Sequence, residues 1–216
     1  QLEVVQRVLA DRFGLTVGFE PGGILYKETI SQSVEGMGHF EPLRHYAEVH
    51  LRLEPLPAGS GVQFGTVTST DELDLNWQRL ALTNAMERDH LGVLTGSPIT
   101  DVRITLTGGR AHAKHTEGGD FRQATYRAIR QGLMQAREAG AAVLLEPWYR
   151  FELEVPGECV GRALSDATRM SAEYEPPTMA GDRAKLVGRV PASEVQDYAL
   201  EVAAYTGGRG HLYLEF

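Results

Sequence analysis

The chain has 216 residues, a formal net charge of −8 and one cysteine. Its length suits one or two domains, with three small ones also possible. No run approaches the roughly 20 apolar residues of a membrane span, so we expect no membrane contact. A single cysteine excludes an internal disulfide and suits a reducing compartment, so we expect a cytoplasmic protein. The acidic charge excludes a protein that coats nucleic acid generally, because phosphate neutralisation needs clustered Lys and Arg.

Residues 1–30 contain one helical pattern and two strand-like patterns. Apolar residues at helical spacing predict a helix over 4–13 that ends at Gly14. Alternation over 17–19 and the apolar run 24–30 predict two strands. One helix and two strands bury little surface, so we interpret this piece as the remnant of a larger domain.

The middle of the chain mixes strands and helices without repeats or low-complexity tracts. Strands are predicted where apolar residues alternate, and helices where they recur every three to four positions after a capping residue. The prediction is a loop over 31–44, strands over 49–53, 62–68 and 99–106, a helix capped by Asp71 or Asp74, and a helix from Asp120 to about Glu138.

The last 70 residues or so have a cleaner order. A Ser-x-x-Gln spacing at Ser193 predicts a capping box at the start of the second helix, and Gly207 and Gly208 predict its end. The order strand–helix–strand–strand–helix–strand is the split, ferredoxin-like βαββαβ arrangement. Its predicted strands cover 149–155, 170–175, 184–190 and 210–216, and its first helix covers 159–167.

One segment runs against the acidic trend. From Asp101 to Arg130, six Lys/Arg stand against three Asp/Glu, which gives a formal charge of +3. Inside it, the stretch 107–124 holds His112 and His115 three positions apart, with a glycine pair on either side. A metal site, a phosphate cradle and an exposed turn are the interpretations to compare.

A metal site would need three or four rigid ligands, and beside the two histidines only Glu117 and Asp120 are near. A phosphate could use the helix N-terminus after the second glycine pair, but a capping Asp120 would compete with the anion. No GxxxxGK[ST] or GxGxxG motif occurs, so nucleotide binding is not expected. The remaining interpretations are a plain strand-to-helix connection and a turn that offers Arg110, Lys114 and the histidines to RNA.

Five stretches together carry a resemblance to a known family. On these residues, in collinear order over nearly the whole chain, the protein resembles the C-terminal half of elongation factor G. It is more similar still to the tetracycline-type ribosomal protection proteins, which are relatives of that factor. The five stretches are 25-LYKETI-30, 54-EPLPAGSG-61, 96-GSPITDVRITL-106, 144-LLEPWYRFELEVP-156 and 206-TGGRG-210.

The resemblance implies an α+β protein in three parts. Residues 1–30 would be the C-terminal part of the third domain, the remnant of a ferredoxin-like fold. Residues 31–143 would be the fourth domain, an elongated, ribosomal-protein-S5-like α+β fold with a left-handed βαβ crossover. Residues 144–216 would be the fifth domain, ferredoxin-like with βαββαβ order, as the pattern of the last 70 residues also predicts.

The resemblance also implies a partner, the ribosome. The fourth domain of the family reaches the decoding region of the small subunit with loops at its tip, and the fifth approaches the large subunit. We therefore expect rRNA contacts with both subunits, no DNA binding and a monomeric fragment. The implied contact residues are Arg110, His112, Ala113, Lys114, His115, Thr116 and Glu117 at the tip, Arg44 and His45 on the adjacent loop, and Arg209 in the fifth domain.

No catalytic, cofactor or metal-binding residue is expected in this chain, because GTP and Mg²⁺ would be bound by another part of the full-length GTPase. The tip differs from those of the relatives. Elongation factor G has Gly-Gly-Arg-Gly-Gln-Tyr-Gly where this chain reads 41-EPLRHYA-47, and the resistance proteins have a tip rich in Tyr, Ser and Pro where it reads 111-AHAKHTE-117. A translocase fragment is therefore an alternative to the protection type. From other classes, a small metal-dependent enzyme that uses His112, His115 and Glu117, and a ferredoxin-like regulatory module, also stay open.

Zinc titration separates the metal-enzyme alternative from the ribosome interpretation. We expect isothermal calorimetry to show no heat at stoichiometric Zn²⁺, because two histidines and a carboxylate on one loop are a weak ligand set. A stoichiometric heat that disappears in a His115→Ala variant would contradict this expectation.

Overall fold

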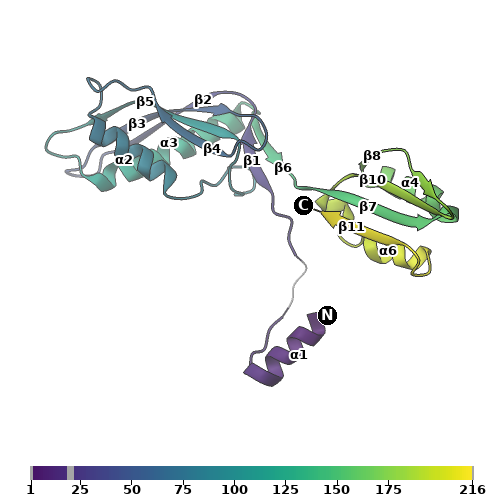
Figure 1. Ribbon diagram of the computed structural model, residues 1–216. Helices are drawn as coiled ribbons and strands as arrows, with labels where there is room; N and C mark the ends of the chain where they lie inside the picture. Colours follow the sequence, from purple (N-terminus) through teal and green to yellow (C-terminus); the bar gives the residue numbers. More distant parts are fainter. Residues whose placement is uncertain (1, 19–21, 216) are drawn as a thin grey trace.

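The computed structural model describes residues 2–18 and 22–215, and these residues form an N-terminal helix and two lobes (Figure 1). The lobes have separate apolar cores, one built from residues between Ile30 and Ala141 and the other from residues between Phe151 and Val202. Helix α1, Leu2–Phe13, ends before Gly14 as predicted and has no buried residue. In the described part of the chain, no helix has the length and apolarity that a bilayer span requires.

The first lobe is a four-stranded sheet covered by two helices. Its strand order is β2-β3-β5-β4, antiparallel except for the parallel pair β4–β5, which is joined through α2. Side chains alternate along β3, so that Val49, Leu51 and Leu53 are buried. Phe121 of α3 stacks on Trp77 of α2 at 5.1 Å. The elements are β2 (Val34–Phe40), β3 (Ala47–Pro55), β4 (Val62–Thr66), α2 (Leu75–Met86), β5 (Val102–Ala111) and α3 (Gly118–Glu138).

Strand β2 contradicts the loop predicted over 31–44. Gly36 and Gly38 suggested a turn, yet both are buried within the strand. A Cβ atom built on Gly36 would overlap the carbonyl oxygen of Ala128, and one on Gly38 would overlap that of Ala124. The glycines are therefore needed because the backbone of α3 lies directly against β2, and not because the chain turns there.

Strand β5 extends farther than the predicted strand 99–106. It runs to Ala111 and pairs with β3 as far as Ala47, with a register shift between His50 and Leu51 that leaves Thr107 as an extra residue. The connection to α3 is thus shorter than the residues 107–119 that the prediction left between the strand and the helix from Asp120. Asp74 caps α2, its carboxylate accepting the Asn76 N–H at 2.8 Å, which selects between the two predicted caps.

A two-stranded sheet closes the base of the first lobe. Strand β1, Lys27–Ile30, pairs antiparallel with β6, Ala142–Leu145. Only this part of the predicted strand 24–30 forms, and the described part of the predicted strand 17–19 is irregular, while Phe19 lies outside the described residues.

The buried carboxylate of Glu28 organises this base. Glu28 is 2% exposed and accepts the N–H groups of Leu94, Thr95 and Gly96 at 2.9, 2.8 and 3.1 Å, and the hydroxyl of Thr95 at 2.9 Å. Burial raises the pKa of Glu28, but the hydrogen bonds from the backbone of Leu94 and Thr95 outweigh burial and hold the pKa below its ordinary value. The loop before β5 is therefore fixed by an ionised side chain of β1.

Asp101 joins the segment 56–61 to the same base. Its carboxylate accepts the Gly61 N–H at 2.9 Å, and its carbonyl oxygen accepts the Leu56 N–H at 2.8 Å. Asp101 has φ 58°, a left-handed conformation that costs free energy in a non-glycine residue and is held here by these bonds. The stretches 25–30, 54–61 and 96–106 therefore meet at the base of the first lobe, together with Leu144 and Leu145, the first two residues of the stretch 144–156.

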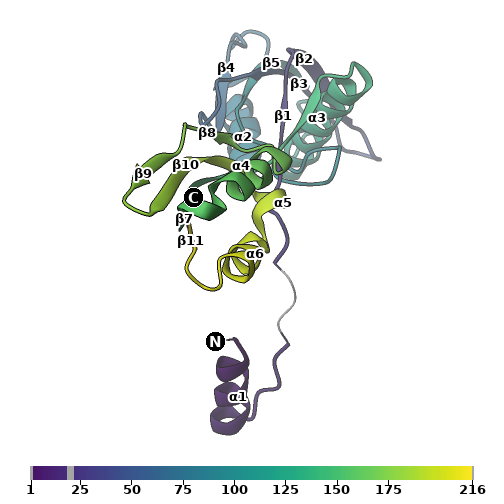
Figure 2. The same ribbon diagram turned by 90° about the vertical axis from the view of Figure 1, so that its right-hand side faces the viewer.

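The second lobe has the predicted ferredoxin-like arrangement. Its sheet order is β11-β7-β10-β8, with all pairs antiparallel, and β9 pairs with the first three residues of β10. Helices α4 and α6 lie on one face of this sheet (Figure 2). The elements are β7 (Trp148–Pro156), η1 (Gly157–Cys159), α4 (Val160–Arg169), β8 (Glu173–Tyr174), β9 (Thr178–Ala180), β10 (Arg183–Pro191), α5 (Ala192–Val195), α6 (Tyr198–Tyr205) and β11 (His211–Glu215).

Two local predictions in this lobe are wrong. The strand predicted over 170–175 is only two residues long, because Met170 caps α4 and Ser171 turns with φ 54°. Ser193 is not a helix cap: the chain is already helical from Ala192, directly after Pro191, and a break then separates α5 from α6. Pro191 explains this start, since its fixed φ suits a helix N-terminus. Gly207 and Gly208 end α6 with positive φ, as predicted.

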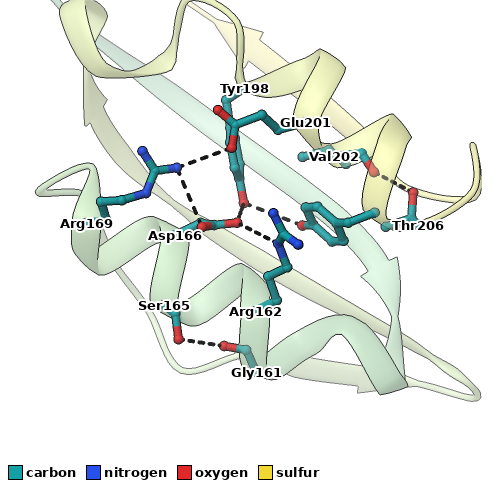
Figure 3. A network of polar contacts seen from close by, with 10 residues as sticks. Gly161, Arg162, Ser165, Asp166, Arg169, Tyr198, Glu201, Val202 and Thr206 are labelled. Atoms are coloured by element: carbon teal, nitrogen blue, oxygen red, sulfur yellow. Dashed lines mark hydrogen bonds and ion pairs between the residues drawn. The ribbon is translucent and has the colours of Figure 1, made fainter.

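Asp166 joins the two helices of the second lobe (Figure 3). Its carboxylate lies 3.5 Å from Arg169 and 3.6 Å from Arg162, and it accepts the Tyr198 hydroxyl at 3.4 Å. Burial, followed by the hydrogen bond with Tyr205, raises the pKa of Tyr198, so its hydroxyl stays protonated as a donor. The network therefore stabilises the packing of α4 on α6.

Replacing Gly38 tests the contact between β2 and α3. We expect Gly38→Ala to lower the free energy of unfolding by about 3 kcal/mol, because the added Cβ meets helix backbone that cannot rotate away. Urea unfolding measures the change. Gly65→Ala on β4 is the matched control, since its Cβ meets nothing within 4 Å and should change stability by less than about 1 kcal/mol. Equal effects of the two variants would refute the contact.

Replacing Glu28 tests the base. At pH 7 we expect Glu28→Gln to lower the free energy of unfolding by about 3 kcal/mol, because an amide cannot accept hydrogen bonds from all four donors. The folded-state pKa of Glu28 is lowered, so its contribution is complete above the unfolded value of 4.5 and is lost as pH falls through the folded value. The difference between wild type and variant should thus shrink below pH 4.5. Urea titrations at several pH values measure it, with exposed Glu35→Gln as control; a difference independent of pH would contradict this account.

Candidate nucleic-acid interface

Two loops form one end of the first lobe, which we call the tip. The tip loop, residues 112–117, joins β5 to α3, and the adjacent loop, residues 41–46, joins β2 to β3. The β3–β5 pairing ends at Ala47 opposite Ala111, and the Tyr46 N–H then donates to the carbonyl of His115 at 2.9 Å. The two loops therefore continue the sheet beyond its last paired residues.

The tip loop is a single tight turn. The N–H groups of His115 and Thr116 both donate to the carbonyl of His112 at 3.1 Å, and the Lys114 N–H donates to the His112 ring at 3.2 Å. The rings of His112 and His115 stack with centroids 4.6 Å apart. The four residues His112, Ala113, Lys114 and His115 are all exposed, so their side chains can reach a partner.

The N-terminus of α3 begins directly behind this turn. Glu117 is the N-cap residue, and not the predicted Asp120. Asp120 is the third residue of the helix, and its buried carboxylate accepts the Glu117 N–H at 2.8 Å. The other oxygen of Asp120 lies 2.9 Å from Nδ1 of His45. A phosphate at this helix N-terminus would face the carboxylate of Asp120, which disfavours a phosphate cradle.

The predicted residues of the adjacent loop take different roles. Arg44 is exposed and has φ 63°, and Leu43 beside it is 90% exposed. His45 is only partly exposed and bonds Asp120, so it joins the adjacent loop to α3. Arg44 is therefore available to a partner, whereas His45 mainly holds the two loops together.

A polar row on β3, which the sequence analysis missed, lies behind the tip. Glu48 accepts hydrogen bonds from His50 at 2.6 Å and from the Tyr46 hydroxyl at 3.0 Å. The hydrogen bond from His50 lowers the pKa of Glu48 more than burial raises it, while burial and Glu48 raise the pKa of Tyr46. Arg110 lies opposite Glu48 in the β3–β5 register. In the sequence, the polar residues at positions 46, 48 and 50 alternate with residues that are buried, and this alternation could have predicted the row.

Most cations of the basic segment hold the lobe together. Within the first lobe, they bind carbonyl or carboxylate oxygens on neighbouring elements, which the count of charges could not reveal. Of the remaining two, Lys114 lies on the tip loop, and Arg110 lies beside it at the end of β5, where it interacts with Tyr46 and Glu48. The structural contacts are Arg103 to Gln63 at 3.0 Å, Arg122 to Glu87 at 3.0 Å, Arg127 to the His39 carbonyl at 2.7 Å and Arg130 to the Gly92 carbonyl at 3.4 Å.

The metal-enzyme alternative gains no support from the tip. Residues 2–18 and 22–215 contain no group of three or more His, Cys, Asp or Glu side chains that could hold a metal ion. His112 and His115 stack face to face. The arrangement is that of an exposed turn with cationic and aromatic side chains, which suits recognition of RNA by stacking and phosphate contacts.

Arg209 lies in the second lobe, in the turn between α6 and β11. Its guanidinium contacts Glu158 at 2.6 Å, and its Nε donates to the carbonyl of Thr206 at 3.2 Å. The ion pair with Glu158 raises the pKa of Arg209. The side chain is exposed, so a phosphate could reach it, but in competition with Glu158.

Comparison with known families identifies the class of protein that carries this fold. The family model described as "Elongation factor G, domain IV" matches residues 22–137, and the one described as "Elongation factor G C-terminus" matches residues 143–216. The two matches correspond to the two lobes of the structure. The chain therefore belongs to the elongation factor G family.

Individual relatives come from two branches of this family. The chain is 30% identical to tetracycline resistance protein TetP of Clostridium perfringens, over 100% of this chain and 33% of that protein. It is 31% identical to elongation factor G 2 of Desulfotalea psychrophila, over 100% of this chain and 31% of that protein. A crystal structure of a Thermus thermophilus protein aligns with TM-score 0.82 and 28% identity, over 100% of this chain and 32% of that one. The chain thus spans about a third of the length of these relatives.

Proposed function

We propose that this chain is the ribosome-contacting part of a translational GTPase and that its tip enters the decoding region of the small subunit. The observation that carries the proposal is the exposed turn at residues 112–115, which presents Lys114 and two histidines at the end of the sheet. Membership of the elongation factor G family supports the ribosome as the partner of this surface, because the members named above act in translation or in resistance to a drug.

Electrostatics favour the tip as the part of the first lobe that contacts RNA. A chain of net charge −8 is repelled by rRNA over most of its surface, so attraction depends on local cations. Arg110 and Lys114 are such cations, and exposed Arg44 adds a third on the adjacent loop. Phosphate contacts of this kind position a protein on RNA, while the stacked histidines and Ala113 can meet bases.

The remaining functional assignments are parts of the same proposal. The tip contacts are Arg110, His112, Ala113, Lys114, His115 and Glu117 together with Arg44, with His45 and Thr116 in support, and Arg209 approaches rRNA of the large subunit. The domain borders are 1–30, 31–143 and 144–216. GTP and Mg²⁺ belong to other parts of the full-length protein, which acts in the cytoplasm, and this chain performs no catalysis itself.

Within the family we favour the tetracycline-type ribosomal protection proteins over a translocase. TetP and two further resistance proteins, TetO and TetM, match at 29–31% identity. The adjacent loop 41-EPLRHYA-47 also lacks the glycines of the elongation factor G segment. The translocase remains the second candidate because elongation factor G 2 matches equally well, at 31% identity.

Neutralising the two tip cations tests the proposal. In the full-length protein with bacterial ribosomes, we expect Arg110→Gln with Lys114→Gln to weaken binding about tenfold or more and to reduce the slope of log K against log salt by about 1 per lost phosphate contact. Ribosome pelleting over a range of salt concentrations measures both quantities.

The matched control is Arg103→Gln with Arg137→Gln, which removes the same charge far from the tip. Arg137 is 19 residues along α3 from its first residue, or roughly 28 Å at 1.5 Å per residue. We expect the control to leave the salt slope unchanged. Identical binding and slopes for both double variants would refute the proposed role of the tip.

A further inference from the structure

Thr116 connects the two loops of the tip, and we propose that its hydroxyl is the positioning group that presets the tip loop for RNA. Its Oγ1 accepts the N–H of His112 at 2.6 Å and donates to the carbonyl of Tyr46 at 2.7 Å. Tyr46 belongs to the adjacent loop, so one side chain closes the turn and fixes it to its neighbour. The inference rests on the proposed function, because it explains how the contacts of that site are held.

Both hydrogen bonds require a hydroxyl at this position. A hydroxyl has one proton and two lone pairs, so it donates to one loop and accepts from the other at the same time. The branched Cβ of threonine restricts χ1, which keeps Oγ1 directed between the two loops. Serine would retain the bonds with less restriction, while valine would keep the shape and lose both.

Thr116 is placed to act through its neighbours rather than on a ligand. It is partly buried beneath the turn, whereas His112 through His115 are exposed. The Tyr46 N–H donates to the carbonyl of His115, and the His45–Asp120 contact joins the adjacent loop to the first turn of α3. The hydroxyl is thus the side-chain contact that reaches the first residue of the turn.

A preset turn binds RNA more tightly than a mobile one. The side chains of the turn lose less conformational freedom on binding if their backbone is already in the bound conformation. Loss of the hydroxyl should therefore weaken ribosome binding without removing any cation. The number of phosphate contacts, and with it the salt slope, should stay the same.

The test compares Thr116→Val with Thr116→Ser in the full-length protein, with bacterial ribosomes as the ligand. We expect valine to weaken binding about tenfold, serine to stay within about twofold of wild type, and the salt slope to be unchanged in both. Amide hydrogen exchange of His112 and His115 in the free protein should accelerate in the valine variant and stay near wild type in the serine variant. Thermal unfolding checks that the lobe is intact, and Thr116→Ala replaces valine if that variant does not fold.

The outcomes separate this inference from the proposed function. If wild type does not bind ribosomes, or if neutralising Arg110 and Lys114 has no effect, the proposed function fails and the inference with it. If those results stand but Thr116→Val binds like wild type while the His112 amide exchanges faster, presetting is refuted. Equal weakening by valine and serine, or a reduced salt slope in the valine variant, also overturns the inference.

Discussion

Gly36 and Gly38 bring the backbone of β2 into direct contact with the backbone of α3, and the geometry of the first lobe depends on this contact. A side chain at either position would overlap a helix carbonyl and lift α3 off the sheet. The tip loop joins the end of β5 to the start of α3, so any shift of the helix would move the loop. The position of the tip is therefore fixed by a packing constraint well inside the lobe.

The opposite end of the lobe depends on buried carboxyl side chains instead. Glu28 holds the loop before β5, and Asp101 holds the turn at Gly61, so that stretches distant in sequence are joined at the base. Three of the five stretches that carry the family resemblance meet here, and a fourth starts here with Leu144 and Leu145 before it continues into the second lobe. They identify the family because they build the lobe, while the tip, which would meet a partner, has its own sequence. Such a division lets one scaffold present different tips.

Much of the fold was predictable from local patterns. Alternation found β3 and β7, helical spacing found α1, and the order of the last elements predicted the ferredoxin-like sheet, which the strand order confirms. Strand β2 was missed because a glycine that permits close packing and a glycine that permits a turn look identical in one sequence. That distinction depends on α3, which follows about 80 residues later, and no local pattern contains it.

The candidate site was predictable in location but not in its internal connections. The excess of Lys and Arg pointed to the segment between Asp101 and Arg130, yet most of those arginines bind structural partners. The contacts of Thr116 with Tyr46 and of His45 with Asp120 join residues about 70 positions apart. Periodicity indicates which face of a helix or strand a residue occupies, but it contains no information about such long-range hydrogen bonds.

The most direct test is site-specific photo-crosslinking from Ala113, whose side chain is an exposed methyl group that can form no hydrogen bond. A photoreactive residue at this position in the full-length, ribosome-bound protein should crosslink to RNA of the small subunit. The same probe at exposed Gln135, near the other end of α3, should not. A probe at Ala113 that fails to reach small-subunit RNA on ribosomes the protein demonstrably occupies would contradict the account.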